Sequence, residues 1–191
     1  MTIILCPGIH DVEITENFMS GLFSIVSDNS IRYNQVKNIL VVPSQGLLPL
    51  SPLHILHFLH DRLGNKLASP VIFIGFSAGV VGAIAAAWQW QLAGGHVKAF
   101  IAIDGWGVPL WGNFPIHRLS HDFFTHWSSL LLGSGQNNFY AEPPVEHLTM
   151  WRSPQTVQGW RVDSSVENTT SNIRLTAAEF LHLLLRHYEA K

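Results

Sequence analysis

The sequence predicts an α/β fold, in which a mostly parallel sheet of about five to six strands carries helices on both faces. Short apolar runs alternate along the chain with segments whose apolar residues have helical spacing, which is typical of this fold class. One of these runs, residues 71–75, leads straight into an Ala-rich segment at residues 78–92. Because 191 residues with 47% hydrophobic side chains can form one sizeable core, we expect a single domain over residues 1–191.

The expected strands are short, apolar and bounded by turn residues. The first of them ends at Pro7 and Gly8, and the fourth ends at Asp104 and Gly105. Runs without polar residues indicate strands that are buried on both faces, as in a parallel sheet. The expected strands cover residues 2–6, 39–42, 71–75, 97–103 and 138–141.

The expected helices are identified by apolar spacing and by capping residues. Ser51 followed by Pro52 provides an N-cap and a proline at the first helical position. Thr176 and Glu179 have the spacing of a capping box for the C-terminal helix. The polar stretch over residues 163–172 predicts a linker or mobile loop before that helix. The expected helices cover residues 16–26, 52–63, 78–92, about 120–132 with Ser120 as its cap, and 176–189.

The most informative motif is Gly-x-Ser-x-Gly, which runs from Gly75 to Gly79 between the expected strand and helix. A serine at such a turn is held in a strained conformation with its hydroxyl accessible. The two glycines are needed because any side chain there would collide with a neighbouring strand or helix. We therefore predict that Ser77 is a nucleophile; the alternative is a tight turn with an incidental serine.

On this motif and its setting, the chain resembles the α/β-hydrolase superfamily of serine esterases, lipases, thioesterases and related acyl-transfer enzymes. The order of strands and helices extends the resemblance to about residue 160, and no insertion is long enough for a large cap domain. The resemblance implies a three-layer α/β-hydrolase-like sandwich, a Ser–acid–His triad and an oxyanion hole. Loops would then cover the active site, above all the aromatic segment at residues 106–127.

The acid of the implied triad is expected at the carboxyl edge of the sheet. Asp104 ends the strand that follows the nucleophile unit, and a carboxylate there can orient a histidine ring and stabilise its charged form. Asp104 could instead be a turn residue, because Asp-Gly is a common turn pair. The alternative acids are Asp122, Glu142 and Glu146, of which Glu142 is favoured because it follows the next expected strand.

The base has to be chosen among eleven histidines. In the order that the resemblance implies, the histidine follows both serine and acid on a loop after a late strand. His147 fits this position best, and His121 and His126 are the alternatives.

The implied oxyanion hole needs two backbone N–H donors. Ala78, which follows the nucleophile, is the first, at the positive end of its helix. The second is expected from the loop after the first strand, where Ile9 matches if Gly8 is the glycine of the superfamily's His-Gly loop. This chain has Pro7 where that loop has its histidine, so the alignment with the loop could be shifted by one residue, and a neighbour of Ile9 could then be the donor.

Composition excludes several classes of partner. A charged fraction of 13% and a net charge of −2 provide no basic surface for nucleic acid and no polybasic patch for a membrane. The apolar stretch at residues 2–6 lacks a basic leader, so we interpret it as a strand and not a signal peptide, and no segment is expected to span a membrane. With a lone Cys6 there is no internal disulfide, which favours a cytoplasmic location.

Neither a metal nor another cofactor is expected. His54, His57 and His60 recur every three residues on an expected helix, but zinc needs three or four converging ligands, and we interpret them as half-buried histidines. The glycines at residues 75–82 lack the lysine of a phosphate loop and the third glycine of a dinucleotide-binding loop.

Together these observations predict a cytoplasmic, cofactor-free serine hydrolase that cleaves a carboxylic ester or thioester through an acyl-enzyme on Ser77. Two alternatives remain at this point. One is an acyltransferase that uses the same serine, and the other is a non-catalytic α/β-hydrolase-like domain that binds a small ligand or a partner.

Overall fold

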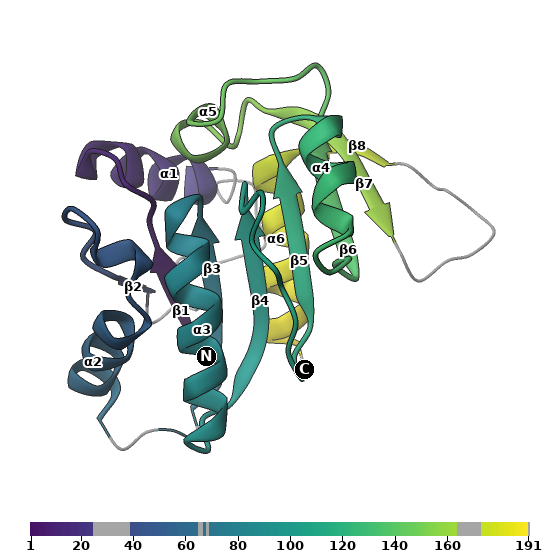
Figure 1. The fold of residues 1–191 in the computed structure, drawn as a ribbon. Helices are drawn as coiled ribbons and strands as arrows, with labels where there is room; N and C mark the ends of the chain where they lie inside the picture. The colour runs from purple at the N-terminus through teal and green to yellow at the C-terminus, as the bar shows by residue number, and fades with distance from the viewer. Residues whose placement is uncertain (25–38, 65–66, 68, 164–172, 191) are drawn as a thin grey trace.

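The computed structural model describes residues 1–24, 39–64, 67, 69–163 and 173–190. Its centre is an eight-stranded sheet with the order β2-β1-β3-β4-β5-β6-β7-β8 (Figure 1). The strands from β1 to β6 pair in parallel, and β7 and β8 complete one edge in antiparallel pairs. The strands are β1 (Thr2–Cys6), β2 (Ile39–Val41), β3 (Val71–Phe76), β4 (Val97–Ile103), β5 (Ile116–Ser120), β6 (Asn137–Ala141), β7 (Gln158–Asp163) and β8 (Ile173–Thr176).

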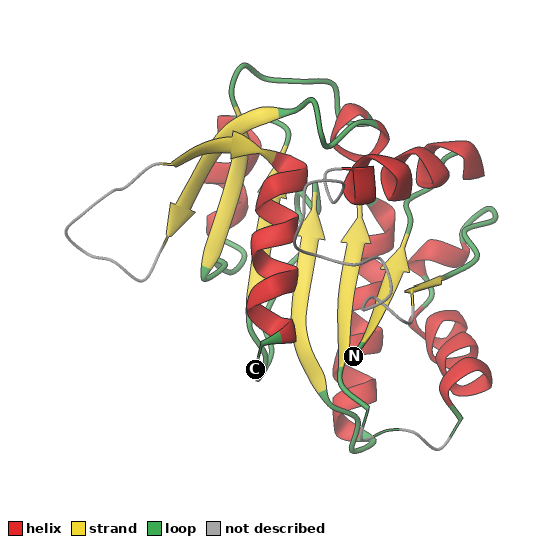
Figure 2. Cartoon of the chain, turned by 180° about the vertical axis from the view of Figure 1, so that it is seen from behind, coloured by secondary structure: helices red, strands yellow, loops and turns green. Residues whose placement is uncertain are grey.

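Helices cover both faces of this sheet, which makes three layers (Figures 1 and 2). One core cluster joins the sheet to α1, α5 and α6, and a second joins the opposite face to α2 and α3. The helices are α1 (Val12–Ser24), α2 (Pro52–Leu63), α3 (Ala78–Leu92), α4 (Phe123–Leu130), α5 (Thr149–Arg152) and α6 (Ala177–Glu189). None of these described helices combines the length and the apolar character that crossing a membrane requires.

Alternation along the strands divides the core between the two layers. Ile72 and Ile74 of β3 belong to the cluster of α1 and α6, whereas Val71 and Phe73 belong to the cluster of α2 and α3. All six β3 residues are buried. The prediction of an α/β fold with a mostly parallel sheet and helices on both faces is therefore confirmed at this level.

The predicted number of strands, five to six, was too low. Strands β5, β7 and β8 were not predicted. Residues 116–120 contain the polar His117 and Arg118, yet both are buried. His117 contacts the Tyr188 hydroxyl at 2.7 Å and the Asn137 carbonyl, and Arg118 donates to the carbonyl oxygens of residues 108, 132 and 133. These partners satisfy polar groups that would otherwise be costly to bury.

Two predicted helix N-caps are confirmed and one is wrong. Ser51 accepts a hydrogen bond from the N–H of residue 54, and Thr176 and Glu179 form both bonds of the capping box. Ser120 does not cap a helix, because it ends β5; Asp122 caps α4 and accepts from the Thr125 N–H at 2.6 Å. Residues 25–26 of the first expected helix and residues 164–172 of the expected linker lie outside the described residues.

The strand order reverses beside β1, which has β2 on one side and β3 on the other. In open parallel sheets such a reversal leaves a crevice at the carboxyl ends of the two strands. Pro7 and Gly8 follow β1, and Ser77 follows β3, so the sequence motif lies at this crevice.

Candidate active site

Ser77 occupies the single residue between β3 and α3 and has backbone angles of φ 51° and ψ −123°. A positive φ is unusual for a residue with a side chain and costs about 1–3 kcal/mol, so such residues cluster at functional sites. The surrounding structure holds the turn: the Ser77 N–H donates to the Ile103 carbonyl of β4 at 2.9 Å.

The two glycines of the motif allow close packing around this turn, as predicted. A Cβ on Gly79 would lie 2.2 Å from the Cys6 carbonyl oxygen, which is far inside van der Waals contact. A Cβ on Gly75 would lie 3.0 Å from the Cα of Val80 on α3. The first turn of α3 can therefore pack directly against the chain that leaves β1.

Asp104 ends β4, next to β3, and its carboxylate is almost completely buried. Its own φ is 50°, and its N–H donates to the Leu119 carbonyl at 2.8 Å. One carboxylate oxygen, Oδ1, accepts the His121 backbone N–H at 2.8 Å, and the other, Oδ2, accepts from His147 Nδ1 at 2.9 Å. Because a carboxylate can only accept, the His147 proton is placed on Nδ1.

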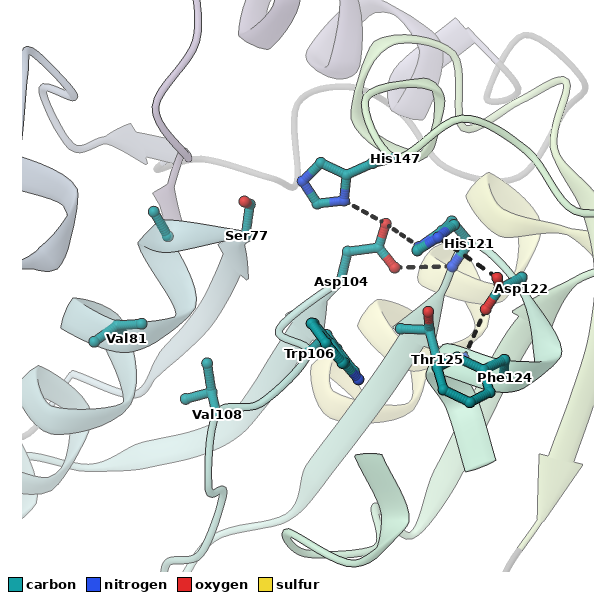
Figure 3. A pocket seen from close by; sticks show the side chains of 11 residues that line it. Ser77, Val81, Asp104, Trp106, Val108, His121, Asp122, Phe124, Thr125 and His147 are labelled. Atoms are coloured by element: carbon teal, nitrogen blue, oxygen red, sulfur yellow. Dashed lines mark hydrogen bonds and ion pairs between the residues drawn. The ribbon is translucent and has the colours of Figure 1, made fainter. Parts of the chain in front are cut away.

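His147 lies between Ser77 and Asp104, with its second ring nitrogen on the side that faces Ser77 (Figure 3). The ring stacks on Phe76 with centroids 4.8 Å apart. Among the hydrogen bonds of the described residues, His147 makes one to Asp104 and none to Ser77. Such bonds are often long before substrate binds. The order serine, histidine, carboxylate is present, although the first contact is not closed.

His121 makes a second contact with the same carboxylate. Its Nδ1 lies 3.0 Å from Asp104 Oδ2, and its Nε2 lies 3.7 Å from Asp122 Oδ2. The Asp104 contact raises the pKa of His121 above its ordinary value, and burial partly opposes this effect. In Figure 3 the His121 ring lies on the far side of Asp104 from Ser77, so His147 is the better placed base.

The other candidates are placed elsewhere. His126 lies on the buried side of α4 and stacks on Tyr140, with centroids 5.2 Å apart; burial, together with the charge of Arg118, lowers its pKa. Glu142 accepts from Trp160 Nε1 at 2.5 Å. Asp122 does reach the pocket, but it is engaged as the cap of α4.

A pocket of about 490 Å³ opens in front of these groups. Its far wall is apolar and comes from α3, the loop after β4, and α4 (Figure 3). Two aromatic residues of the segment at residues 106–127, Trp106 and Phe124, do line this pocket, but part of that segment is strand β5 and helix α4 and not loop. The lining residues are Ser77, Ala78, Val81, Asp104, Trp106, Val108, His121, Asp122, Phe124, Thr125 and His147.

The two predicted oxyanion donors have different surroundings. Ala78 lines the pocket and begins α3, whose first N–H groups have no partner within the helix. The loop after β1 also approaches Ser77, since a Cβ on Gly8 would lie 3.1 Å from the Ser77 Cβ. The Ile9 side chain is 53% exposed and does not line the pocket, so the role of its N–H stays a prediction.

The amphipathic pattern of α4 is inverted, which the sequence analysis did not foresee. Its buried residues are polar: Thr125, His126 and Ser129. Three of its large apolar residues and the one that follows it are more than half exposed: Phe123, Phe124, Trp127 and Leu131. Helical spacing of apolar residues was a visible signal, but it normally marks the core side of a helix. Of these exposed residues, Phe124 lines the pocket, together with the exposed Trp106.

The histidines considered for metal binding do not converge. His54 Nε2 contacts the Pro43 carbonyl at 3.0 Å, and His57 pairs with Asp61 on the surface of α2 at 3.3 Å. Within the described residues, the group whose donor atoms do converge is that of Asp104, His121 and His147, within 4.8 Å of one another.

No protein-family model matches the chain, and a search of curated proteins found no match to it. The resemblance to the α/β-hydrolase superfamily therefore stays an expectation that rests on residues 75–79 and their setting.

Proposed function

We propose that the protein is a serine hydrolase that cleaves a carboxylic ester or thioester. One observation carries this proposal: a serine at a left-handed turn beside a pocket faces a histidine whose other ring nitrogen donates to a buried carboxylate. The turn at Ser77, the pocket and the orientation of His147 by Asp104 have independent structural causes. Because all three lie together at the carboxyl edge of the sheet, a catalytic role is favoured.

In the proposed reaction, His147 Nε2 takes the proton of Ser77 as Oγ attacks the substrate carbonyl carbon. Asp104 stabilises the resulting imidazolium. The oxyanion is bound by the N–H of Ala78 and, in this proposal, by that of Ile9. His147 then gives its proton to the leaving alcohol or thiol as the bond to carbon breaks. Water, deprotonated by the same histidine, attacks the acyl-enzyme and releases the carboxylic acid and free Ser77.

The pocket supports a partly apolar acyl group as the substrate. Val81, Trp106, Val108 and Phe124 provide its apolar wall, and the polar groups of His147 and Asp104 lie on the side of Ser77. We also propose a cytoplasmic location, since Cys6, the one cysteine of the sequence, is free and buried.

Covalent labelling with a fluorophosphonate tests the proposal. We expect intact mass and peptide mapping to show one adduct at Ser77, absent in Ser77→Ala. Labelling should slow by about 10²–10⁴-fold in His147→Ala, the range for loss of a general base. Ser20→Ala is a matched control, because this exposed serine lies on α1 outside the pocket lining.

Two results would count against this proposal. A folded wild-type protein that neither labels nor cleaves short esters would favour the non-catalytic binding domain. Labelling that is lost in His121→Ala but retained in His147→Ala would make His121 the base.

A further inference from the structure

We infer that Asp104, His121 and His147 form a binding site for a divalent transition-metal ion, with Zn²⁺ the best match, and that the bound ion inhibits the proposed hydrolase. The inhibition rests on the proposed function, whereas the binding site itself does not.

The first step is the convergence of three donors of suitable type. Oδ2 of Asp104 lies 2.9 Å from His147 Nδ1 and 3.0 Å from His121 Nδ1. Tetrahedral ligands at about 2.0–2.2 Å from Zn²⁺ lie about 3.4 Å from one another. The donor atoms of the three side chains lie within 4.8 Å of one another, so the carboxylate oxygen is already close to both rings, and the two rings have to move toward each other to enclose an ion. Two imidazoles and one carboxylate, with water in a fourth position, match the donor set of open zinc sites.

The second step is the state of His121 Nδ1. This atom is buried and lies 3.0 Å from Asp104 Oδ2, an ion-pair distance without the geometry of a hydrogen bond. An imidazole nitrogen in this position can direct its lone pair at a metal ion that the carboxylate shares.

The third step is the support around the ligands. Asp104 Oδ1 is held by the His121 backbone N–H at 2.8 Å, which leaves Oδ2 to face the two rings. Asp122 lies 3.7 Å from His121 Nε2, the side on which metal-binding histidines commonly meet a carboxylate. The side chains of His121 and His147 are 27% and 42% exposed, so an ion and its water can enter through the pocket.

Occupancy would remove the base. A neutral imidazole that binds a metal through Nδ1 carries its one proton on Nε2. In His147 this is the nitrogen that faces Ser77, so it could no longer accept the serine proton. The ion would also replace the hydrogen bond between His147 and Asp104.

Isothermal titration with Zn²⁺ tests the site without any activity. We expect one ion per chain in the wild type and an equal affinity in Ser77→Ala, since Ser77 is not a ligand. Affinity should fall at least 10–100-fold in His121→Gln and in His147→Gln, as even partners of the ligands contribute that much. His57→Gln is the matched control on the surface of α2, with unchanged affinity expected. A wild type that does not bind, or two folded ligand variants that bind as tightly as the wild type, would overturn the inference.

Fluorophosphonate labelling with and without saturating Zn²⁺ tests the inhibition. We expect the ion to suppress labelling of the wild type and a chelator to restore it, with much weaker suppression in His121→Gln. Zinc that binds by calorimetry but leaves the labelling rate unchanged would refute the inhibition. If the metal-free wild type does not label at all, the proposed function fails, and the calorimetry still decides the metal site.

Discussion

Asp104→Asn separates the role of the carboxylate from its place in the fold. Asparagine is among the few residues that tolerate the positive φ of this position. Its amide oxygen can keep the bond from the His121 N–H, which puts the NH₂ group opposite His147 Nδ1 at about the present 2.9 Å. An NH₂ group donates, so His147 must accept on Nδ1 and carry its proton on Nε2, the nitrogen toward Ser77.

The expected loss follows from this exchange of tautomers. In a triad the equivalent change lowers the rate by about 10⁴, which corresponds to about 5 kcal/mol of activation free energy. We would measure the rate of fluorophosphonate labelling and the kcat for a short ester, with urea unfolding to verify that the variant folds. Asp61→Asn, at an exposed aspartate on α2, is the matched control and should react like the wild type.

The reasoning fails if folded Asp104→Asn labels at the wild-type rate. Glu142→Gln provides the complementary test, because Glu142 is engaged by Trp160 and should not affect labelling. A large loss in Glu142→Gln together with normal labelling in Asp104→Asn would make Glu142 the acid.

Three further outcomes test the turn, the core and the pocket. Ser77→Gly should unfold with a free energy about 1 kcal/mol above that of Ser77→Ala, because glycine accepts the positive φ without strain; equal urea midpoints would contradict this. Burial lowers the pKa of His117 to about 4. The neutral ring therefore contributes its full stability above about pH 6.5, and this contribution is lost as the pH falls toward 4. The free energy of unfolding should fall by about 3 kcal/mol over this range. In urea titrations at neutral and acidic pH, His117→Gln should lose less stability than the wild type, and equal losses would show that His117 does not contribute. Phe124→Ala should lower kcat/KM for a hexanoyl ester about tenfold, which corresponds to about 1.4 kcal/mol of activation free energy. We expect little change in kcat/KM for an acetyl ester, and little change for either ester in the exposed control Leu92→Ala. Equal losses on both esters would place the acyl chain elsewhere.

The centre of the fold could be predicted because its signals are local. Residues 71–92 contain a strand without polar residues, a turn with two glycines and a helix of small residues, and each part needs little information from elsewhere. The position of Asp104 followed from the same logic, since neighbouring parallel strands end at the same edge of the sheet.

The parts that could not be predicted depend on distant partners. In β5, His117 is buried because Tyr188, at the far end of the chain, supplies a hydroxyl. The buried residues of α4 are polar, and the large exposed residues are apolar. Helical spacing alone would predict that the apolar side of this helix faces the core. His121 was considered only as an alternative base, because nothing in the sequence shows that its ring and that of His147 meet at one carboxylate.

The backbone of His121 explains why both rings are where they are. Its N–H holds Asp104 Oδ1, and its carbonyl accepts the Val145 N–H at 3.0 Å, two residues before His147. The backbone of one residue therefore contacts both Asp104 and the loop that leads to His147, and it does so without the imidazole of His121. The side chain has no step of its own in the proposed hydrolysis, although it lies 3.0 Å from the Asp104 carboxylate. The role of metal ligand fits its imidazole and its position beside Asp104, so the proposed inhibitory site combines two groups of the proposed triad with a ring that the triad does not need.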